Sequence, residues 1–171
     1  VTAANIQAFR EKTGTFAGGT VIDSTYCCLH FGRLEFKDAG DPLGALAFYP
    51  NAGGFGGVLA NNDTKRYDQA RAEPGPWKVA SGTKRGGTQA VSVEEDISTN
   101  QTLKNTLDLI GVNWFELSGG VVIARGNNTL SYSQKLTKYL HVRRMLIRMR
   151  SEFLPVLDKA YDEPSDPFLW R

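Results

Sequence analysis

The chain has 171 residues, of which 41% are hydrophobic, and a formal net charge of +2 at pH 7. This length and apolar content suit one domain with a core of its own, and the near-neutral charge argues against a protein that is cationic throughout. No apolar run approaches the ~20 residues of a membrane-spanning helix.

The first part of the chain predicts a short helix and then extended structure. Ile6 and Phe9 are spaced for one face of a helix. Residues 26–37 are predicted to be extended, because Leu34 and Phe36 alternate with charged residues in the period-2 pattern of a half-exposed strand.

The segment between residues 43 and 87 predicts little regular structure. Leu43–Ala60 is apolar but contains a proline and two glycine pairs, so we expect a loop that leads into a short helix near Gly57–Asn61. Residues 61–87 are polar and rich in glycine, proline, lysine and arginine, which predicts a long irregular loop. Gly82–Thr88 lacks the G-x-x-x-x-G-K-[ST] spacing of a phosphate-binding loop.

Regular structure is predicted to return after residue 88. Ala90–Val93 suits a strand, and either Ser98 or Thr99 can cap a helix that ends at Gly111. The buried face of this helix is predicted to consist of Leu103, Leu107 and Ile110.

The order of the predicted elements indicates the fold class. Two strands, Val112–Leu117 and Val121–Ala124, follow this helix and precede a second, long helix. Strand, helix, two strands and helix make an α+β fold with α/β-like layers, in which helices cover a mixed β-sheet. Residues 1–88 are then an irregular, strand-rich part with the long loop 61–87, and residues 89–171 a sheet-and-helix core.

The long helix is basic and amphipathic, and it is predicted for Gln134–Leu154 near the C-terminus. Its apolar side chains recur at helical spacing, which predicts a buried stripe: Val142, Met145, Leu146, Met149 and Phe153. Its flanks and far side carry a run of cations with no acid before Glu152: Lys135, Lys138, Arg143, Arg144, Arg148 and Arg150. The pattern predicts a helix that packs on its own core and presents a basic surface.

The last residues predict a helix that begins but does not continue. Asp166 suits the N-cap and Pro167 the first helical position, but only one turn follows. A single turn cannot recover the cost of helix nucleation. We therefore expect residues 1–171 to be a single fragment of a larger protein, ending in a truncated helix.

Six short segments carry a further signal, although each is weakly specific on its own. They are Gly57–Ala60 with Asp63 and Arg66, Gly75–Ala80, Leu103–Asn113, Val121–Arg125 with Thr129–Ser131, Tyr139–Arg144, and Glu163–Trp170. In this order and at these spacings, the chain from about Leu46 to Trp170 resembles the tail sheath protein of contractile phage tails and related contractile injection systems. It departs from the family pattern at Gly126–Asn128, which is inserted, and at Val79–Ser81, which lacks a proline.

The resemblance implies a structural protein that needs no cofactor. Sheath subunits polymerise as stacked hexameric rings around an inner tube and contract to drive the tube through a target cell envelope. The implied partners are other copies of the chain, the inner tube protein, and baseplate and tail terminator proteins, with no nucleic acid and no direct membrane insertion. The implied location is the virion tail, assembled in the host bacterial cytoplasm. The family's extended arms, which add strands to a neighbour's sheet, are expected to be missing.

The resemblance also suggests a role for the basic helix. A sheath must hold its tube and then release it, and exposed ion pairs are individually weak. We expect the cationic flank to face the inner tube, through Lys135, Lys138, Arg143, Arg144, Arg148 and Arg150. Arg143 and Arg144 have an alternative, which is pairing within the chain with acids such as Asp158 or Glu163.

Two other function classes remain open. The basic helix 135–150, with Tyr132 and Tyr139 nearby, also suits a nucleic-acid-binding module, although the acids elsewhere nearly cancel its charge. An enzyme is less favoured, because His30 and His141 stand in unrelated segments and no nucleophile or metal-ligand spacing is present.

The acids and the cysteines have simpler interpretations. The acidic cluster Glu94–Asp96 suits a solvated strand end. The adjacent Cys27 and Cys28 are interpreted as small buried hydrophobes in a reducing compartment.

Overall fold

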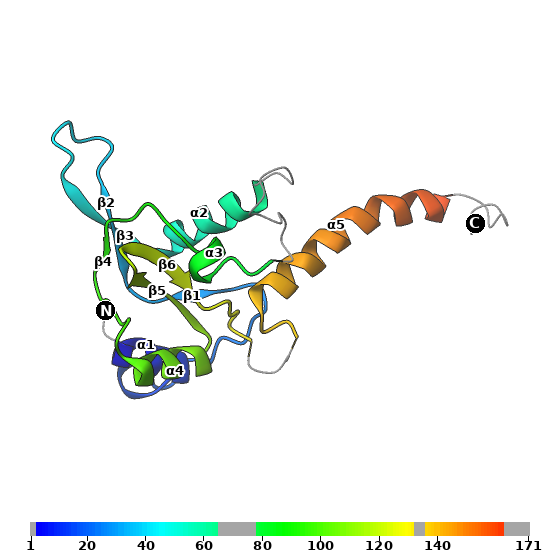
Figure 1. Ribbon diagram of the computed structural model, residues 1–171. Coiled ribbons are helices and arrows are strands. Elements are labelled where there is room, and N and C mark those ends of the chain that lie inside the picture. The colour runs from blue at the N-terminus through cyan, green and yellow to red at the C-terminus, as the bar shows by residue number, and fades with distance from the viewer. Residues whose placement is uncertain (1–2, 65–77, 132–135, 163–171) are drawn as a thin grey trace.

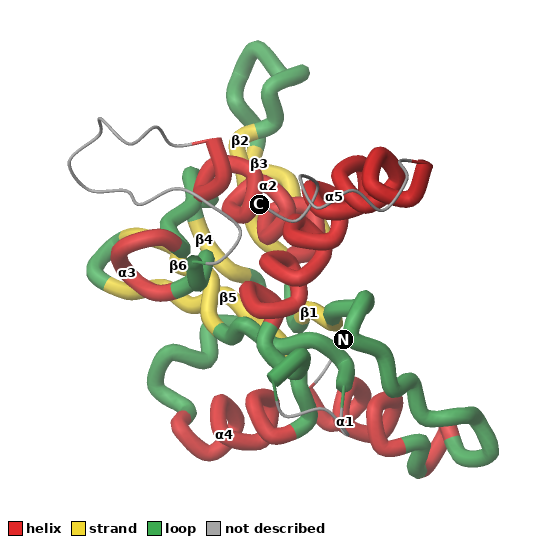
Figure 2. The backbone as a smooth tube through the Cα atoms, turned by 90° about the vertical axis from the view of Figure 1, so that its right-hand side faces the viewer, coloured by secondary structure: helices red, strands yellow, loops and turns green. Residues whose placement is uncertain are grey.

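The protein consists of a layer of β-strands with helices on both sides (Figure 1). The computed structural model describes residues 3–64, 78–131 and 136–162. Helix α2 (Asn51–Thr64) lies on one side of the strands, and α1 (Ala3–Glu11) and α4 (Gln101–Leu109) pack against each other on the opposite side (Figure 2). The predicted α+β fold is confirmed.

The central sheet has three strands in the order β1-β5-β6. Its middle strand β5 (Val112–Ser118) runs parallel to β1 (Leu29–His30) and antiparallel to β6 (Val121–Arg125). The sheet is therefore mixed, as predicted. The boundaries of β5 and β6 lie within one residue of those expected, because both strands are short, mostly apolar segments bounded by glycines.

Strand β5 divides the interior into two cores. Successive side chains of a strand point to opposite faces, and Val112 and Trp114 join the cluster under α1 and α4 while Phe115 joins the cluster under α2. The ring centroid of Phe115 lies 6.2 Å from that of Phe55 on α2. Because all residues from Val112 to Glu116 are buried, this strand is covered by helices on both faces.

The second sheet has three strands, two of which form a hairpin that extends away from the body. Strand β2 (Arg33–Lys37) lies between β3 (Leu46–Pro50) and β4 (Ser92–Val93), and both neighbours are antiparallel to it. Leu34 is fully buried against α2. A Cβ atom at Gly54 of α2 would clash with Leu34 Cδ1, so a larger residue there would force this buried side chain to move.

A buried carboxylate ties α4 to the central sheet. The side chain of Glu116 on β5 forms ion pairs with Lys104 Nζ at 2.8 Å and with Arg125 Nε at 2.7 Å. Burial alone would raise the pKa of Glu116, but the hydrogen bonds from Lys104 and Arg125 outweigh it and lower this pKa below its ordinary value. The carboxylate therefore stays charged and fully paired at neutral pH.

The loop after β6 is buried, although it contains no regular structure. Asn128 exchanges two hydrogen bonds with the side chain of Asn113 on β5, at 2.8 and 2.9 Å. Gly126 permits this approach, because its φ is +81° and a Cβ atom there would lie 2.6 Å from Asn113 Oδ1. Thr129 continues the network by donating its hydroxyl to the carbonyl oxygen of Thr137, at 2.9 Å.

A buried arginine on α1 closes the same network. Arg10 is 2% exposed and donates from Nε to the carbonyl oxygen of Ile110, at 2.9 Å. Its two terminal nitrogens donate to the carbonyl oxygens of Ile22 and Leu130. One guanidinium thus holds α1, the end of α4 and the buried loop together.

The structure differs from the predictions mainly in the first half of the chain. Leu43–Ala60 was predicted to be a loop with a short helix at its end, but it forms β3 and most of α2. The glycines of α2 lower its helix propensity, so the sequence predicted only a short part of this helix. Within the segment predicted to be a loop, residues 61–87, α2 continues to Thr64 and Gly82–Arg85 forms the short helix α3, while residues 65–77 lie outside the described residues.

Smaller corrections concern a cap, a strand and the cysteines. The N-cap of α4 is Asn100, whose side chain accepts a hydrogen bond from Leu103 N at 3.0 Å, and neither Ser98 nor Thr99. Of the strand predicted at Ala90–Val93, only Ser92–Val93 (β4) forms. Cys27 is exposed and Cys28 half-buried, so the prediction of two buried thiols was wrong.

Two further helical segments complete the described part of the chain. They are a 3-10 turn at Gly14–Phe16 and α5 (Leu140–Asp162). Across residues 3–64, 78–131 and 136–162, every helix is too short or too polar to cross a lipid bilayer. The helix predicted to start at Asp166–Pro167 lies outside the described residues.

We predict that replacing Arg10 with Ala destabilises the fold by about 2–4 kcal/mol, because three carbonyl oxygens lose a charged donor at a buried site. Urea unfolding of the chain followed by circular dichroism measures the change. The matched control is Glu11→Ala on the exposed side of the same helix, which should stay within about 0.5 kcal/mol of the parent. Equal effects of the two substitutions would contradict the role given to Arg10.

Candidate assembly surface

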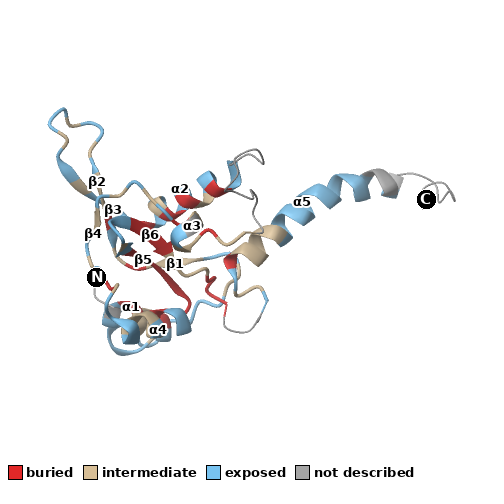
Figure 3. Ribbon diagram, in the orientation of Figure 1, coloured by how far each residue is buried: buried red, intermediate tan, exposed pale blue. Residues whose placement is uncertain are grey.

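Helix α5 projects from the body of the protein, opposite the β2–β3 hairpin (Figure 1). Only its first turns contact the body, and from Leu146 onward the described side chains are exposed (Figure 3). The exposed large apolar side chains are Leu146, Ile147, Met149, Phe153, Leu154, Val156, Leu157 and Tyr161. An exposed apolar surface of this extent is typical of a protein–protein contact.

The predicted burial of this helix in its own core was wrong. Val142 and Met145 are half-buried, but Leu146, Met149 and Phe153 are 39%, 43% and 57% exposed. The helix also begins at Leu140 instead of Gln134 and continues to Asp162. Amphipathic spacing shows that one side of a helix needs an apolar neighbour, and it does not show which chain supplies that neighbour.

Two arginines fix the base of α5 to the body. Arg144 forms an ion pair with Asp63, near the C-terminal end of α2. The guanidinium of Arg143 lies over the ring of Tyr26, 3.7 Å from its centroid, in a cation–π contact. Both were predicted either to bind the tube or to form contacts within the chain. Contacts within the chain exist, with Tyr26 and Asp63. Of the acids named as partners, Glu163 lies outside the described residues.

The first turn of α5 is also held by the buried loop. Leu140 N donates to the carbonyl oxygen of Asn127 at 2.8 Å, and His141 N donates to the side-chain oxygen of Asn127 at 3.3 Å. Burial lowers the pKa of His141, so its ring is neutral beside the Asn127 side chain. The direction of α5 is thereby set by the same loop that joins the cores.

The six predicted basic residues do not share one surface. Lys135 lies outside the described residues, and Lys138 precedes the helix in a turn. Arg143 and Arg144 contact the body, whereas Arg148 and Arg150 are exposed on the projecting part of α5. Arg148 pairs with Glu152, one turn further along the helix.

Arg148 and Arg150 lie on opposite sides of α5. Each helical residue advances the direction by about 100°, so two residues turn it by about 200°. One side carries Arg144, Arg148, Ser151 and Glu152 and is polar. The other carries Leu146, Phe153, Leu154 and Leu157 and is apolar, with Arg150 among them. The helix therefore presents two chemically distinct faces.

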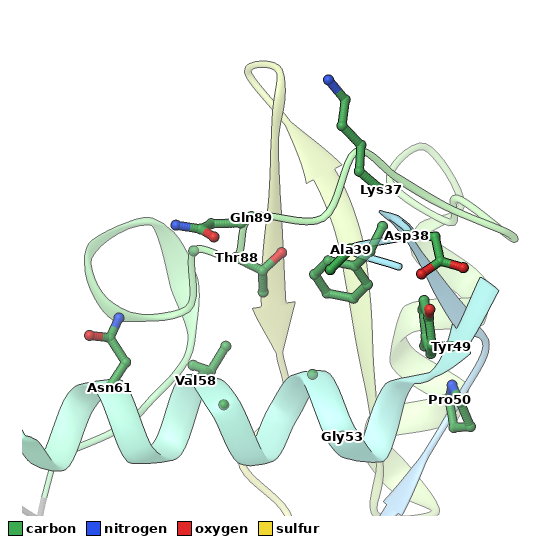
Figure 4. A pocket seen from close by; sticks show the side chains of 14 residues that line it. Lys37, Asp38, Ala39, Tyr49, Pro50, Gly53, Val58, Asn61, Thr88 and Gln89 are labelled. Atoms are coloured by element: carbon green, nitrogen blue, oxygen red, sulfur yellow. The ribbon is translucent and has the colours of Figure 1, made fainter. Parts of the chain in front are cut away.

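A groove of about 950 Å³ lies on another part of the surface, between α2, the β2–β3 hairpin and the segment around Thr88. Figure 4 shows α2 along one side of the groove, with Thr88 and Gln89 across from it and Tyr49 and Asp38 at one end. Phe36, Tyr49, Pro50 and Val58 give it an apolar lining. Sequence reasoning missed this groove because its walls come from three distant segments.

Two glycines leave the α2 side of the groove open. A Cβ atom at Gly53 or Gly57 would meet no atom of the chain within 4 Å. A glycine inside a helix is about 1 kcal/mol less favourable than alanine, and no contact within the described part of the chain requires glycine at either position. The bare backbone here allows another segment to approach α2 closely.

The described residues do not assemble a metal centre. No group of three or more His, Cys, Asp and Glu side chains within residues 3–64, 78–131 and 136–162 could hold a metal ion. Burial lowers the pKa of His30 to about 4, and burial together with the charge of Cys27 raises the pKa of Cys28 to about 11. A neutral imidazole packed on Phe55 and a protonated thiol have structural roles.

The predicted acidic cluster also has a structural role. Glu94 pairs with Arg33 of β2. Asp96 accepts hydrogen bonds from Ser98 N at 3.0 Å and from Leu117 N at 3.4 Å. Glu94 and Asp96 are exposed, as predicted for a solvated strand end, but their contacts also fix the connection between β4 and α4.

Three solved structures contain chains with the fold of almost the whole protein. A chain of the anti-feeding prophage (AFP) baseplate, determined by cryo-EM, has a TM-score of 0.66 at 15% identity, over 98% of this chain and 45% of that chain. The contracted AFP helical sheath gives 0.64 at 18% identity, over 92% and 39%. The contracted PVC sheath complex of an extracellular contractile injection system gives 0.68 at 16% identity, over 99% and 41%. No protein-family model and no curated protein matches the sequence.

These matches confirm the resemblance at the level of the fold. The protein shares its architecture with chains of contractile injection systems, although fewer than one residue in five is identical. It spans about two fifths of the length of the chains it matches. The motifs that carried the resemblance meet in space, since Asp63 of one motif pairs with Arg144 of another.

We predict that Asp63 and Arg144 couple in a double-mutant cycle by about 0.5–1 kcal/mol, because the pair is only partly exposed and joins α2 to α5. The cycle uses Asp63→Asn and Arg144→Gln, and urea unfolding measures the four free energies. The control is the cycle of Arg148→Gln and Glu152→Gln, whose exposed i,i+4 pair should couple by at most about 0.5 kcal/mol. An Asp63–Arg144 coupling no larger than the control would show that the pair does not anchor α5.

Proposed function

We propose that the protein is a structural subunit of a contractile sheath and is not an enzyme. The observation that carries the proposal is the match of almost the whole chain to the fold of chains in two contracted sheath structures and one baseplate structure. The projecting helix α5 supports it, because a subunit that polymerises must offer surfaces to its neighbours.

In the proposed assembly, copies of the protein form hexameric rings that stack helically around an inner tube. Contraction of this stack drives the tube through a target cell envelope. The partners are then other copies of the chain, the tube protein, and baseplate and terminator proteins. The protein would be located in the tail of a virion or in an injection particle, assembled in the bacterial cytoplasm.

The polar face of α5 is the proposed contact with the tube. Arg148 is exposed there, and Lys138 lies in the turn that precedes the helix. Exposed ion pairs contribute only ~0.2–1 kcal/mol each, so a tube held by many of them is bound through repetition and released without breaking a large apolar interface. Arg143 and Arg144 contribute indirectly, by fixing the direction of the helix.

A nucleic-acid-binding module is supported less well. Of the predicted cations, Arg143 lies over Tyr26 and Arg144 pairs with Asp63. The cations left on the projecting helix, Arg148 and Arg150, point in opposite directions. A duplex needs several cations along one face to neutralise successive phosphates, so this helix is a poor match for it.

Immunogold labelling of contractile particles from the source cells tests the proposed function. Antibodies raised against the purified 171-residue chain should place gold along the length of the sheath cylinder in negative stain. Pre-immune serum is the control. Gold confined to the baseplate, to the tube or to material without cylinders would overturn the assignment to a sheath.

We predict that Arg148→Glu weakens the hold of the sheath on its tube, because each subunit exchanges an attraction for a repulsion at an exposed contact. Particles that carry the variant should lose their tube at a salt concentration about two- to threefold lower than the parent. Arg148→Lys keeps the charge and should behave as the parent. Unchanged tube retention with Arg148→Glu would place this face of α5 away from the tube.

A further inference from the structure

We infer that the apolar face of α5 docks into the α2 groove of a second copy of the chain. The inference rests on the proposed function, because an assembly of identical subunits brings the two surfaces together. It assigns to α5 a second role, distinct from the tube contact of its polar face. The docking elements are the face around Leu146, Phe153 and Leu157 on one copy and the groove beside Gly53 and Gly57 on the other.

The two surfaces cannot meet within one molecule. Arg144 is held by Asp63 at the C-terminal end of α2, and from this point α5 runs outward, away from the groove and the β2–β3 hairpin (Figure 1). A contact between different patches of two identical chains is heterologous, and repetition of it produces rings or helical stacks. The geometry therefore favours an assembly that propagates.

The shapes of the two surfaces suit a helix packed on a helix. With no side chain at Gly53 or Gly57, successive turns of α2 present bare backbone to the groove. Side chains of an incoming helix can then lie against this backbone, as ridges fit into grooves. Tyr49 on β3, which is 42% exposed, supplies an apolar contact at one side.

Charge also matches between the surfaces. Arg150 is the cation within the apolar face of α5. The groove has a carboxylate at one end, that of Asp38, while the side chain of Lys37 points away from α2 (Figure 4). An arginine beside this carboxylate fixes the direction in which the incoming helix lies.

The contact is small. Residues 146–157 extend about 18 Å, and half the circumference of a helix about 10 Å wide gives roughly 300 Å². A standard stable interface buries about 800 Å² on each partner. Two isolated copies therefore meet only transiently, and the contact gains strength from repetition in the assembly.

Intermolecular paramagnetic relaxation enhancement detects such a transient contact. The probe is a nitroxide on Ser151→Cys, on the polar side of α5 and outside the docking face, in a chain that also carries Cys27→Ser and Cys28→Ser, mixed at high concentration with unlabelled ¹⁵N chain. We expect the amides of Gly53, Gly57 and Thr88 in the ¹⁵N chain to broaden selectively. Absent or evenly distributed broadening would overturn the inference.

Two matched pairs of variants in the ¹⁵N or spin-labelled chain sharpen the test. Gly57→Leu fills the groove and should abolish the selective broadening, whereas Gly56→Leu, beside it on α2 but outside the groove, should preserve it. Arg150→Glu on the labelled chain should reduce the broadening and Arg148→Glu should not. Dispersed ¹⁵N spectra and thermal unfolding establish that each variant folds, and broadening that survives Gly57→Leu in a folded chain would exclude this groove.

The result of the relaxation measurement can be distinguished from the result of the experiment that tests the proposed function. The relaxation measurement uses only the 171-residue chain, and immunogold labelling uses assembled particles. Gold on the sheath without selective broadening would leave the proposed function standing and reject this contact. Selective broadening without gold on a sheath would establish the contact in a different assembly.

Discussion

The structure depends on satisfying the polar groups of one buried loop. Residues 127–131 lie between the two cores without a helix or strand to pair their backbone, and a buried unpaired amide or carbonyl is costly. Their partners come from several parts of the chain: Asn113 on β5, Arg10 on α1, the first turn of α5, and the carbonyl oxygens of Cys27 and Lys138. Each partner is thereby fixed in position, and so is the direction in which α5 leaves the body. The exposed surface of the protein follows from this internal network.

The sequence predicted those elements whose signal is local. Strands β5 and β6 were found because they are short, mostly apolar segments bounded by glycines, and the apolar face of α4 because its spacing is helical. Helix α2 was mostly missed, since its four glycines lower helix propensity and resemble a loop. The contacts that allow it to fold are tertiary: Gly54 fits under Leu34 and Phe55 packs on Phe115. Helix propensity does not reveal a contact with a segment that is distant in the sequence.

In the candidate site, too, the sequence predicted the local pattern but not the tertiary contacts. A helical wheel identified the apolar and basic sides of α5, but it could not show that the apolar side faces outward. It also treated six cations as one surface, whereas Arg143 and Arg144 contact the body of the protein through Tyr26 and Asp63. A signal for the Arg144 pair was present, since Asp63 and Arg144 stand in two of the motifs that carried the resemblance. Arg10 belonged to no motif, and only the structure identifies its role.

Weak contacts suit an assembly that has to change its arrangement. A large apolar interface between subunits would hold one state, because burying apolar area contributes ~25 cal/mol per Å² and the energy grows with that area. Roughly 300 Å² on one side of α5 and a few exposed charges on the other stay below the size of a stable interface. In the proposed assembly, each contact can then break and re-form, while many copies together keep the stack intact. The open glycines of α2 fit the proposed arrangement, since each lowers helix stability by about 1 kcal/mol and no contact within the described residues fills the space beside Gly53 and Gly57.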